Sequence, residues 1–249
     1  MQITAIKTHK ITIADTDIFP ILDTYFVSLP EKSVVAVTSK IIAITEGRIV
    51  KVGEVEKETL IQEEAAYYLP SLENKYNINF TIKNNILAPS AGIDESNGDG
   101  NYILWPEDPQ DAANSIRSYL QKRFGLQEVG VIITDSKTTP LRWGVTGFAL
   151  SHSGFAALKS YIGEPDLFDR PFQYEKVNVM DSLAASAALV MGEGREQTPL
   201  ALIEDIPFVV FQDRNPTPEE LKTLHISLDE DLYAPFLKSV QWRKGKSSK

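Results

Sequence analysis

Residues 129–136 carry the side chains of this sequence that are best suited to chemistry. An apolar, mostly β-branched run, long enough for a buried strand and too short for a typical helix, ends there in Asp135 and Ser136. A carboxylate and a hydroxyl at the mouth of a strand suit a hard divalent cation that carries phosphate, because such cations prefer oxygen ligands and bridge nucleotide phosphates. A solvated Asp-Ser turn is the simpler alternative, since both residues are favoured in turns.

Two further segments place acidic residues beside glycines. Residues 91–100 offer Asp94 as a metal ligand and Asn97 as a hydrogen-bond donor to a phosphate or sugar oxygen, although their composition fits a plain surface loop equally well. Residues 191–199 hold Glu193 between two glycines. If the three acidic segments converge, they can hold two divalent ions about 3.5–4 Å apart, the arrangement that clamps a transferring phosphoryl group.

Basic residues that could balance anionic charge lie near two of the predicted strands. Ser39 and Lys40 follow the strand expected at 33–38, at a position where a phosphate could arrive. Arg142 follows the run at 129–136, and a guanidinium binds a carboxylate or phosphate through two points. A solvent-exposed arginine is the alternative, because most arginines lie on protein surfaces.

Composition narrows the class of protein. With 249 residues the chain can form a single catalytic unit, as one large domain or two lobes. A net charge of -9 argues against a broad surface for nucleic acid. The absence of cysteine excludes disulfides and thiolate chemistry and fits a reducing compartment. No apolar run reaches membrane-spanning length and residues 1–10 lack the apolar core of a signal peptide, so we expect a soluble cytoplasmic protein without membrane partners.

Signatures of other chemistries are absent from the sequence. It contains no GK[ST] phosphate loop, no GxGxxG after a strand, no HExxH and no GxSxG. His9, His152 and His225 are scattered, which disfavours a histidine-based metal site or a Ser-His-Asp triad. Oxygen-bearing groups therefore remain as the source of chemistry.

Hydrophobic periodicity and turn residues predict alternating strands and helices that must position these groups. Strands are expected around Ile3, and at 11–13, 33–38, 78–87, 129–136, 148–150, 176–179, 200–203 and 208–211. Helices are expected after 15–17, at 56–69 and 111–124, from Asp181 or Ser182 to 190, after Pro218 and at 229–240. The many alanines of the helix that ends at 190 imply close packing against a neighbour. The lysine-rich end, 243–249, is expected to fray.

Several of these segments together resemble the coenzyme F420-0:L-glutamate ligase family, enzymes that use GTP to join glutamate to a deazaflavin precursor. The resemblance is carried, in chain order, by residues 38–48, 91–94 with 96–97, 132–135 through Arg142 and Gly144, and 189–194 with 198–199. It implies a mixed α/β (α+β) fold outside the Rossmann and P-loop groups and an intertwined homodimer. It also implies two divalent ions, Mg²⁺ or Mn²⁺, with K⁺ as an accessory.

The resemblance also implies roles for individual residues. Asp94 and Asp135 would hold one metal ion, and Ser136 and Glu193 the other. As our own hypothesis, L-glutamate and a carboxylate-bearing small molecule join through an acyl phosphate, and Asp135 and Arg142 take part in catalysis. Lys40, Arg142 or Arg195 could offset charge on the acyl phosphate, and Arg142 is favoured among them. The nucleotide would be bound by Lys10, Ile11, Thr12, Ile13, Ser39, Lys40, Asn97, Met191, Gly192, Gly194, Arg195, Glu196, Gln197 and Thr198.

The sequence departs from the family pattern at several positions. Ile44 stands where the family usually has a lysine, and Ser136 where threonine is more frequent. Residues 138–140 read Thr-Thr-Pro instead of Gly-Arg-Pro, and Trp143 replaces the second of two paired arginines. Loss of an arginine removes a two-point anion clamp, so the acceptor can differ. A folate γ-glutamyl ligase, a nucleotide- and metal-binding module without ligase activity, and a metal-dependent phosphatase are the alternatives.

Overall fold

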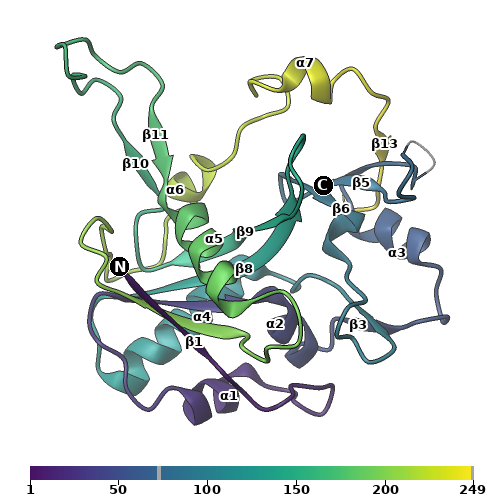
Figure 1. The fold of residues 1–249 in the computed structure, drawn as a ribbon, viewed down its shortest axis with the longest axis horizontal. Coiled ribbons are helices and arrows are strands. Elements are labelled where there is room, and N and C mark those ends of the chain that lie inside the picture. Colours follow the sequence, from purple (N-terminus) through teal and green to yellow (C-terminus); the bar gives the residue numbers. More distant parts are fainter. Residues whose placement is uncertain (72–73, 248–249) are drawn as a thin grey trace.

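A five-stranded mixed sheet forms the centre of the computed structural model, which describes residues 1–71 and 74–247 (Figure 1). The strands lie in the order β1 (Gln2–Ile6), β12 (Leu200–Glu204), β2 (Ser33–Thr38), β8 (Val129–Thr138) and β9 (Val145–Ser153). β2 and β8 are parallel, and the other neighbouring pairs are antiparallel. The mixed α/β class predicted from the sequence is confirmed.

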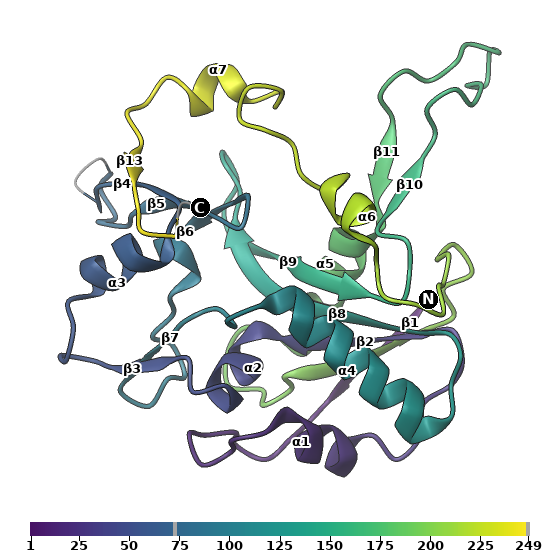
Figure 2. The same ribbon diagram turned by 180° about the vertical axis from the view of Figure 1, so that it is seen from behind.

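Helices cover both faces of the central sheet (Figures 1 and 2). One face packs against α1 (Ile18–Tyr25), α2 (Ser39–Thr45) and α4 (Pro109–Phe124), and the other against α5 (Val179–Met191). Successive residues of a strand point to opposite faces, so Val35 and Val131 enter the first core while Val34 and Ile132 enter the second. Burial on both faces explains why β2 and β8 are nearly continuous apolar runs.

A smaller antiparallel sheet lies beside the central one. Its order is β13 (Arg243–Lys244), β4 (Tyr67–Leu69), β5 (Phe80–Lys83) and β6 (Ile86–Pro89). α3 (Lys57–Glu64) packs near β4, and a separate ladder joins β3 (Ile49–Lys51) to β7 (Asn101–Ile103). The chain after α6 (Pro218–Lys222) crosses through α7 (Ala234–Leu237) to the smaller sheet (Figure 2). No helix within residues 1–71 and 74–247 has both the length and the apolar character needed to cross a membrane.

Two predicted elements in the first half of the chain are wrong in extent. The strand expected at 78–87 is a hairpin, because Asn84 and Asn85 adopt positive φ angles of 50° and 59°, which a tight two-residue turn requires. The helix expected at 56–69 ends at Glu64, and residues 67–69 pair with β5 as β4. Aromatic residues favour a pleated, half-buried surface, which explains why Tyr67 and Tyr68 leave the helix.

The strands expected at 11–13 and 208–211 failed because a strand needs a hydrogen-bonded neighbour, which a sequence pattern does not reveal. Residues 11–13 form a loop, and the strand expected at 208–211 is reduced to one bridge between Phe211 and Phe155. The helix expected at 229–240 contains only the single turn α7. Conversely, Arg243 and Lys244 pair with β4 instead of fraying; residues 248–249 of that expected segment lie outside the described residues.

The alanine-rich helix α5 packs closely against β9, as its composition predicted. Its N-cap is Asn178, whose side chain accepts from the Asp181 backbone N–H, so neither Asp181 nor Ser182 is the cap. Ala184 is fully buried, and a Cβ added at Gly147 of β9 would lie 2.4 Å from the Cβ of Ala188 and 2.8 Å from the carbonyl oxygen of Ala184. The helix therefore approaches the strand at a distance that only glycine permits.

Gly147→Val is expected to lower the free energy of unfolding by about 1–3 kcal/mol, because overpacking forces side chains and backbone apart. Urea unfolding at neutral pH measures the change. The neighbouring Thr146→Val, at an exposed position of the same strand, is the matched control and should change stability little. Equal stability of the two variants would show that α5 and β9 are not in tight contact.

Candidate active site

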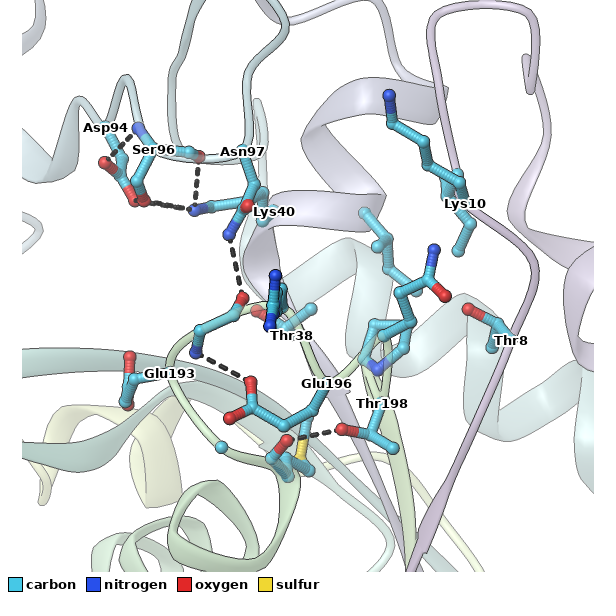
Figure 3. Close-up of a pocket in the computed structure, with 18 of the residues that line it drawn as sticks. Thr8, Lys10, Thr38, Lys40, Asp94, Ser96, Asn97, Glu193, Glu196 and Thr198 are labelled. Carbon is cyan, nitrogen blue, oxygen red and sulfur yellow. Dashed lines mark hydrogen bonds and ion pairs between the residues drawn. The ribbon is translucent and has the colours of Figure 1, made fainter.

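The three acidic segments of the sequence line one cavity of about 600 Å³ in the described part of the chain. Figure 3 shows two of them, at Asp94 and at Glu193. Asp94 comes from the loop after the 3₁₀ turn Ser90–Gly92, Asp135 and Ser136 from β8, and Glu193 from the loop after α5. The end of β2 and the start of α2 contribute Thr38 and Lys40 to the wall. Segments that are distant in sequence are thus brought together.

Asp135 and Ser136 lie within β8 and not at its end. β2 stops at Thr38, which is opposite Thr134, whereas β8 continues to Thr138 in its ladder with β9. The register of that ladder shifts between Ile133 and Thr134, where Leu150 of β9 has no partner on β8. Asp135 reaches the cavity because the neighbouring strand β2 has already ended at Thr38, and not because β8 itself ends there.

The ammonium group of Lys40 binds the Asp94 segment. Its Nζ lies 2.6 Å from Oδ2 of Asp94 and donates to the carbonyl oxygen and Oγ of Ser96, at 2.9 and 3.1 Å (Figure 3). Burial raises the pKa of Asp94, but the hydrogen bonds and charge of Lys40, together with hydrogen bonds from Ser96, outweigh burial and leave the pKa below its usual value. Asp94 is thus an anion that already binds a cation.

Asp135 has a different electrostatic environment. Burial raises its pKa to about 6, against hydrogen bonds from the backbone N–H of Ser136 and the indole of Trp105, and the nearby charge of Asp94 adds to the rise. The Ser136 N–H donates to Oδ1 at 2.8 Å, and Trp105 Nε1 donates to Oδ2. Trp105 was not predicted, because no sequence pattern links an isolated tryptophan to a carboxylate 30 residues away.

Ser136 and Glu193 meet directly. The Ser136 hydroxyl donates to Oε2 of Glu193 at 3.1 Å. The loop that carries Glu193 is folded around another carboxylate, since Glu196 accepts from the Gly194 N–H at 2.8 Å. Asn97 closes the loop from the opposite side by donating its Nδ2 to the Gly194 carbonyl oxygen at 3.1 Å (Figure 3).

Most of the residues predicted to bind nucleotide lie around this cavity. Its lining includes Lys10, Ile11, Lys40, Asn97, Met191, Gly192, Gly194, Arg195, Glu196, Gln197 and Thr198. Residues that sequence reasoning missed also line it, among them Thr8, His9, Thr38 and Ser96. Thr38 could have been predicted from the sequence, because it is the last residue of the expected strand and directly precedes Ser39 and Lys40.

Four predicted residues are not part of the lining. Ser39 is buried at the start of α2, and Thr12 and Ile13 belong to a loop in which the Thr12 N–H donates to Asp15. Arg142 lies in the exposed turn between β8 and β9. The strand continues past Asp135 for three more residues, which carries Arg142 away from the carboxylate that it follows in sequence.

The oxygen donors of the cavity match a hard divalent cation in chemical type. Carboxylates and hydroxyls are among the oxygen ligands that such a cation prefers in proteins. The ammonium group of Lys40 contacts Asp94 and so occupies the position that a bound cation would take beside this carboxylate. Within residues 1–71 and 74–247, no group of three or more acidic, histidine or cysteine side chains has the spacing of a metal site. The donors instead form two sets, Asp94 near Asp135 and Ser136 against Glu193.

The amino-acid sequence of this chain matches a family model and several curated relatives, all of one protein family. A sequence model described as F420-0:Gamma-glutamyl ligase matches residues 4–205. A segment of 131 residues is 39% identical to the Coenzyme F420:L-glutamate ligase of Methanococcus maripaludis strain C7 and covers 53% of this chain and 52% of that protein. The protein of the same name from Methanopyrus kandleri is 37% identical over 126 residues, or 50% of each chain. The one from Archaeoglobus fulgidus is 38% identical over 151 residues, 60% of this chain and 57% of the relative. The chain thus spans about half the length of the curated relatives it matches.

Proposed function

This chain belongs to the F420-0:gamma-glutamyl ligase family, and we propose that residues 1–249 act as one catalytic unit that uses GTP to join L-glutamate to a carboxylate-bearing acceptor of the coenzyme F420-0 type. The observation that carries this proposal is the convergence of Asp94, Asp135, Ser136 and Glu193 on one cavity. Lys10, Lys40 and Arg195 line the same cavity and supply positive charge for a triphosphate.

The proposed reaction has two steps, a phosphoryl transfer followed by an acyl transfer. An oxygen of the acceptor carboxylate attacks the γ-phosphorus of GTP, the bond to the β-phosphate oxygen breaks, and GDP leaves as an acyl phosphate forms. The amine of glutamate then attacks the acyl carbon, the carbon–oxygen bond to phosphate breaks, and an amide, phosphate and one proton are released. Such transfers depend mostly on positioning and charge neutralisation.

The residues of the cavity would divide this work. Asp94 with Asp135, and Ser136 with Glu193, would hold two divalent cations, Mg²⁺ or Mn²⁺, with K⁺ as an accessory. When bound, these ions would neutralise phosphate charge. Lys40 would exchange its contact with Asp94 for a phosphate oxygen, and Asn97 would exchange the Gly194 carbonyl for the nucleotide.

A direct assay separates this function from the alternatives. Purified chain is incubated with GTP or ATP, Mg²⁺ or Mn²⁺, L-glutamate, and either coenzyme F420-0 or a folate, and phosphate release and product mass are measured. Glutamylated coenzyme F420-0 formed with GTP supports the proposal, and a glutamylated folate identifies the folate ligase instead. Phosphate release without glutamate indicates a phosphatase, and nucleotide binding without turnover indicates a binding module.

The hairpin of β10 (Leu158–Ser160) and β11 (Lys176–Asn178) supports the further proposal that the chain forms a homodimer. It projects from the body of the protein (Figures 1 and 2). Leu167 and Phe168 near its tip are 97% and 77% exposed, which is unfavourable for apolar side chains unless another surface covers them.

Leu167→Asp combined with Phe168→Asp is therefore expected to shift the protein from dimer to monomer, because charges at the centre of an apolar contact are costly to desolvate. Light scattering coupled to size-exclusion chromatography measures the mass. Val27→Asp, at an apolar residue 88% exposed elsewhere on the chain, is the matched control and should leave the mass unchanged. A monomeric unmodified protein would contradict the homodimer.

A further inference from the structure

Trp105 lies between the candidate active site and the smaller sheet. It follows β7, is 1% exposed, and donates its indole N–H to Oδ2 of Asp135. The other oxygen of that carboxylate accepts from the Ser136 N–H. An ionised carboxylate has about four acceptor positions on its two oxygens, so these two bonds leave roughly two positions open to the cavity.

The indole ring is held on several sides. Gly92, at a φ of +73°, lies directly against it, and a Cβ at this position would be 2.0 Å from Nε1 of Trp105. Phe148 packs against the ring with centroids 6.3 Å apart. The ammonium of Lys83 lies 5.3 Å from the ring centroid and is itself fixed by Glu64 at 2.5 Å. Because the ring is held on these sides, its N–H points in a fixed direction, toward Asp135.

The backbone on either side of the ring is also tied down. The Leu104 N–H donates to the Arg48 carbonyl oxygen at 3.0 Å, and Arg48 Nε donates to the Trp105 carbonyl oxygen at 3.2 Å. Arg48 also binds Glu64, the carboxylate that fixes Lys83. The position of the indole is thus set by Lys83 of the smaller sheet together with Arg48, Gly92 and Phe148, and not by the strand that carries Asp135.

From this geometry we propose that Trp105 is a positioning residue, whose N–H orients the Asp135 carboxylate so that its free acceptor positions face the cation expected in the cavity. The proposal rests on the metal-binding role assigned to Asp135 under the proposed function. Hydrogen-bond partners of metal-binding side chains typically contribute about 10- to 100-fold to metal affinity or activity. A residue that only fills space would contribute to stability and not to metal affinity.

The test compares Mn²⁺ binding by Trp105→Phe and by the unmodified chain, with and without GTP, using the electron paramagnetic resonance of free Mn²⁺. Trp105→Phe keeps an aromatic ring and removes the donor, and a roughly 10- to 100-fold weaker Mn²⁺ affinity is expected. Trp242→Phe is the matched control, because it also removes an indole hydrogen bond, to the Leu237 carbonyl oxygen, and should bind Mn²⁺ normally.

A second variant guards against a folding defect. Benzothienylalanine at position 105 has the shape of tryptophan and no N–H donor, so the melting temperature should stay near that of the unmodified chain while Mn²⁺ affinity falls by the same factor. Unchanged Mn²⁺ affinity in this variant or in folded Trp105→Phe would overturn the positioning role alone. Failure of the unmodified chain to bind Mn²⁺, even with GTP, would instead overturn the metal site of the proposed function, and the positioning role with it.

Discussion

Asp135→Asn is expected to reduce turnover in the proposed ligase reaction by about 10²- to 10³-fold, because the metal ions proposed to stabilise its transition state depend on the charge of their ligands by several kcal/mol. Asparagine has the same shape and its oxygen can still accept from Trp105, whereas its amide nitrogen cannot accept from the Ser136 N–H. Because the shape and one of the two hydrogen bonds are kept, the fold should persist. Burial raises the pKa of Asp135 to about 6, which reflects the cost of a charge at this position, and the neutral amide avoids that cost.

Steady-state rates with saturating GTP and glutamate measure the loss, and thermal unfolding checks that the variant is folded. The matched control is Asp111→Asn, an exposed aspartate in the first turn of α4, which should keep full activity. Treating the unmodified enzyme with a chelator should reproduce the loss, and added Mg²⁺ or Mn²⁺ should reverse it in the unmodified enzyme only. Near-normal turnover by folded Asp135→Asn would refute the assigned role.

Glu64→Ala is expected to lower the free energy of unfolding by about 3–5 kcal/mol, since breaking a buried ion pair leaves its partner charged and unpaired. Glu64 lies 2.5 Å from Lys83 and 2.7 Å from Arg48, and the Lys83 side chain is only 6% exposed. For a chain of this size the change corresponds to a melting temperature lower by roughly 6–20 °C.

The neighbouring Glu63 is the matched control on the same helix. Its pair with Lys246 is solvent-exposed, with side chains 44% and 74% exposed, so Glu63→Ala should cost about 1 kcal/mol or less. Glu64→Ala combined with Lys83→Met should recover much of the lost stability, because an apolar side chain replaces the stranded ammonium. Equal melting temperatures for the two single variants would contradict the buried ion pair.

The pH dependence of this effect has a definite sign. Burial raises the pKa of Glu64, but Lys83 and Arg48 outweigh burial and hold the pKa below its usual value of 4.5. The unfolded chain then binds the proton more tightly than the folded one, so the contribution of Glu64 is complete above pH 4.5 and declines as the pH falls further. The stability difference between the unmodified chain and Glu64→Ala should shrink correspondingly in acid.

The central elements of the fold were predictable from the amino-acid sequence. β2 and β8 were predictable because strands buried on both faces are continuous apolar runs, and α4 because Gly125 ends it in a left-handed conformation at φ +68°. The acidic segments around Asp94, Asp135 and Glu193 were visible as carboxylates beside glycines or at the end of an apolar run. These patterns lie within single segments, so each segment can be predicted without knowing what it contacts in the folded protein.

How those segments contribute to the cavity depends on their tertiary contacts. Asp135 is exposed to the cavity because β2 ends beside it while β8 continues, and that same continuation carries Arg142 out of the lining. The contacts of Lys40 with Asp94 and of Trp105 with Asp135 join residues 54 and 30 positions apart. Strand ends, register and such side-chain pairs depend on which distant segments become neighbours, and the pattern of a single segment does not contain that information.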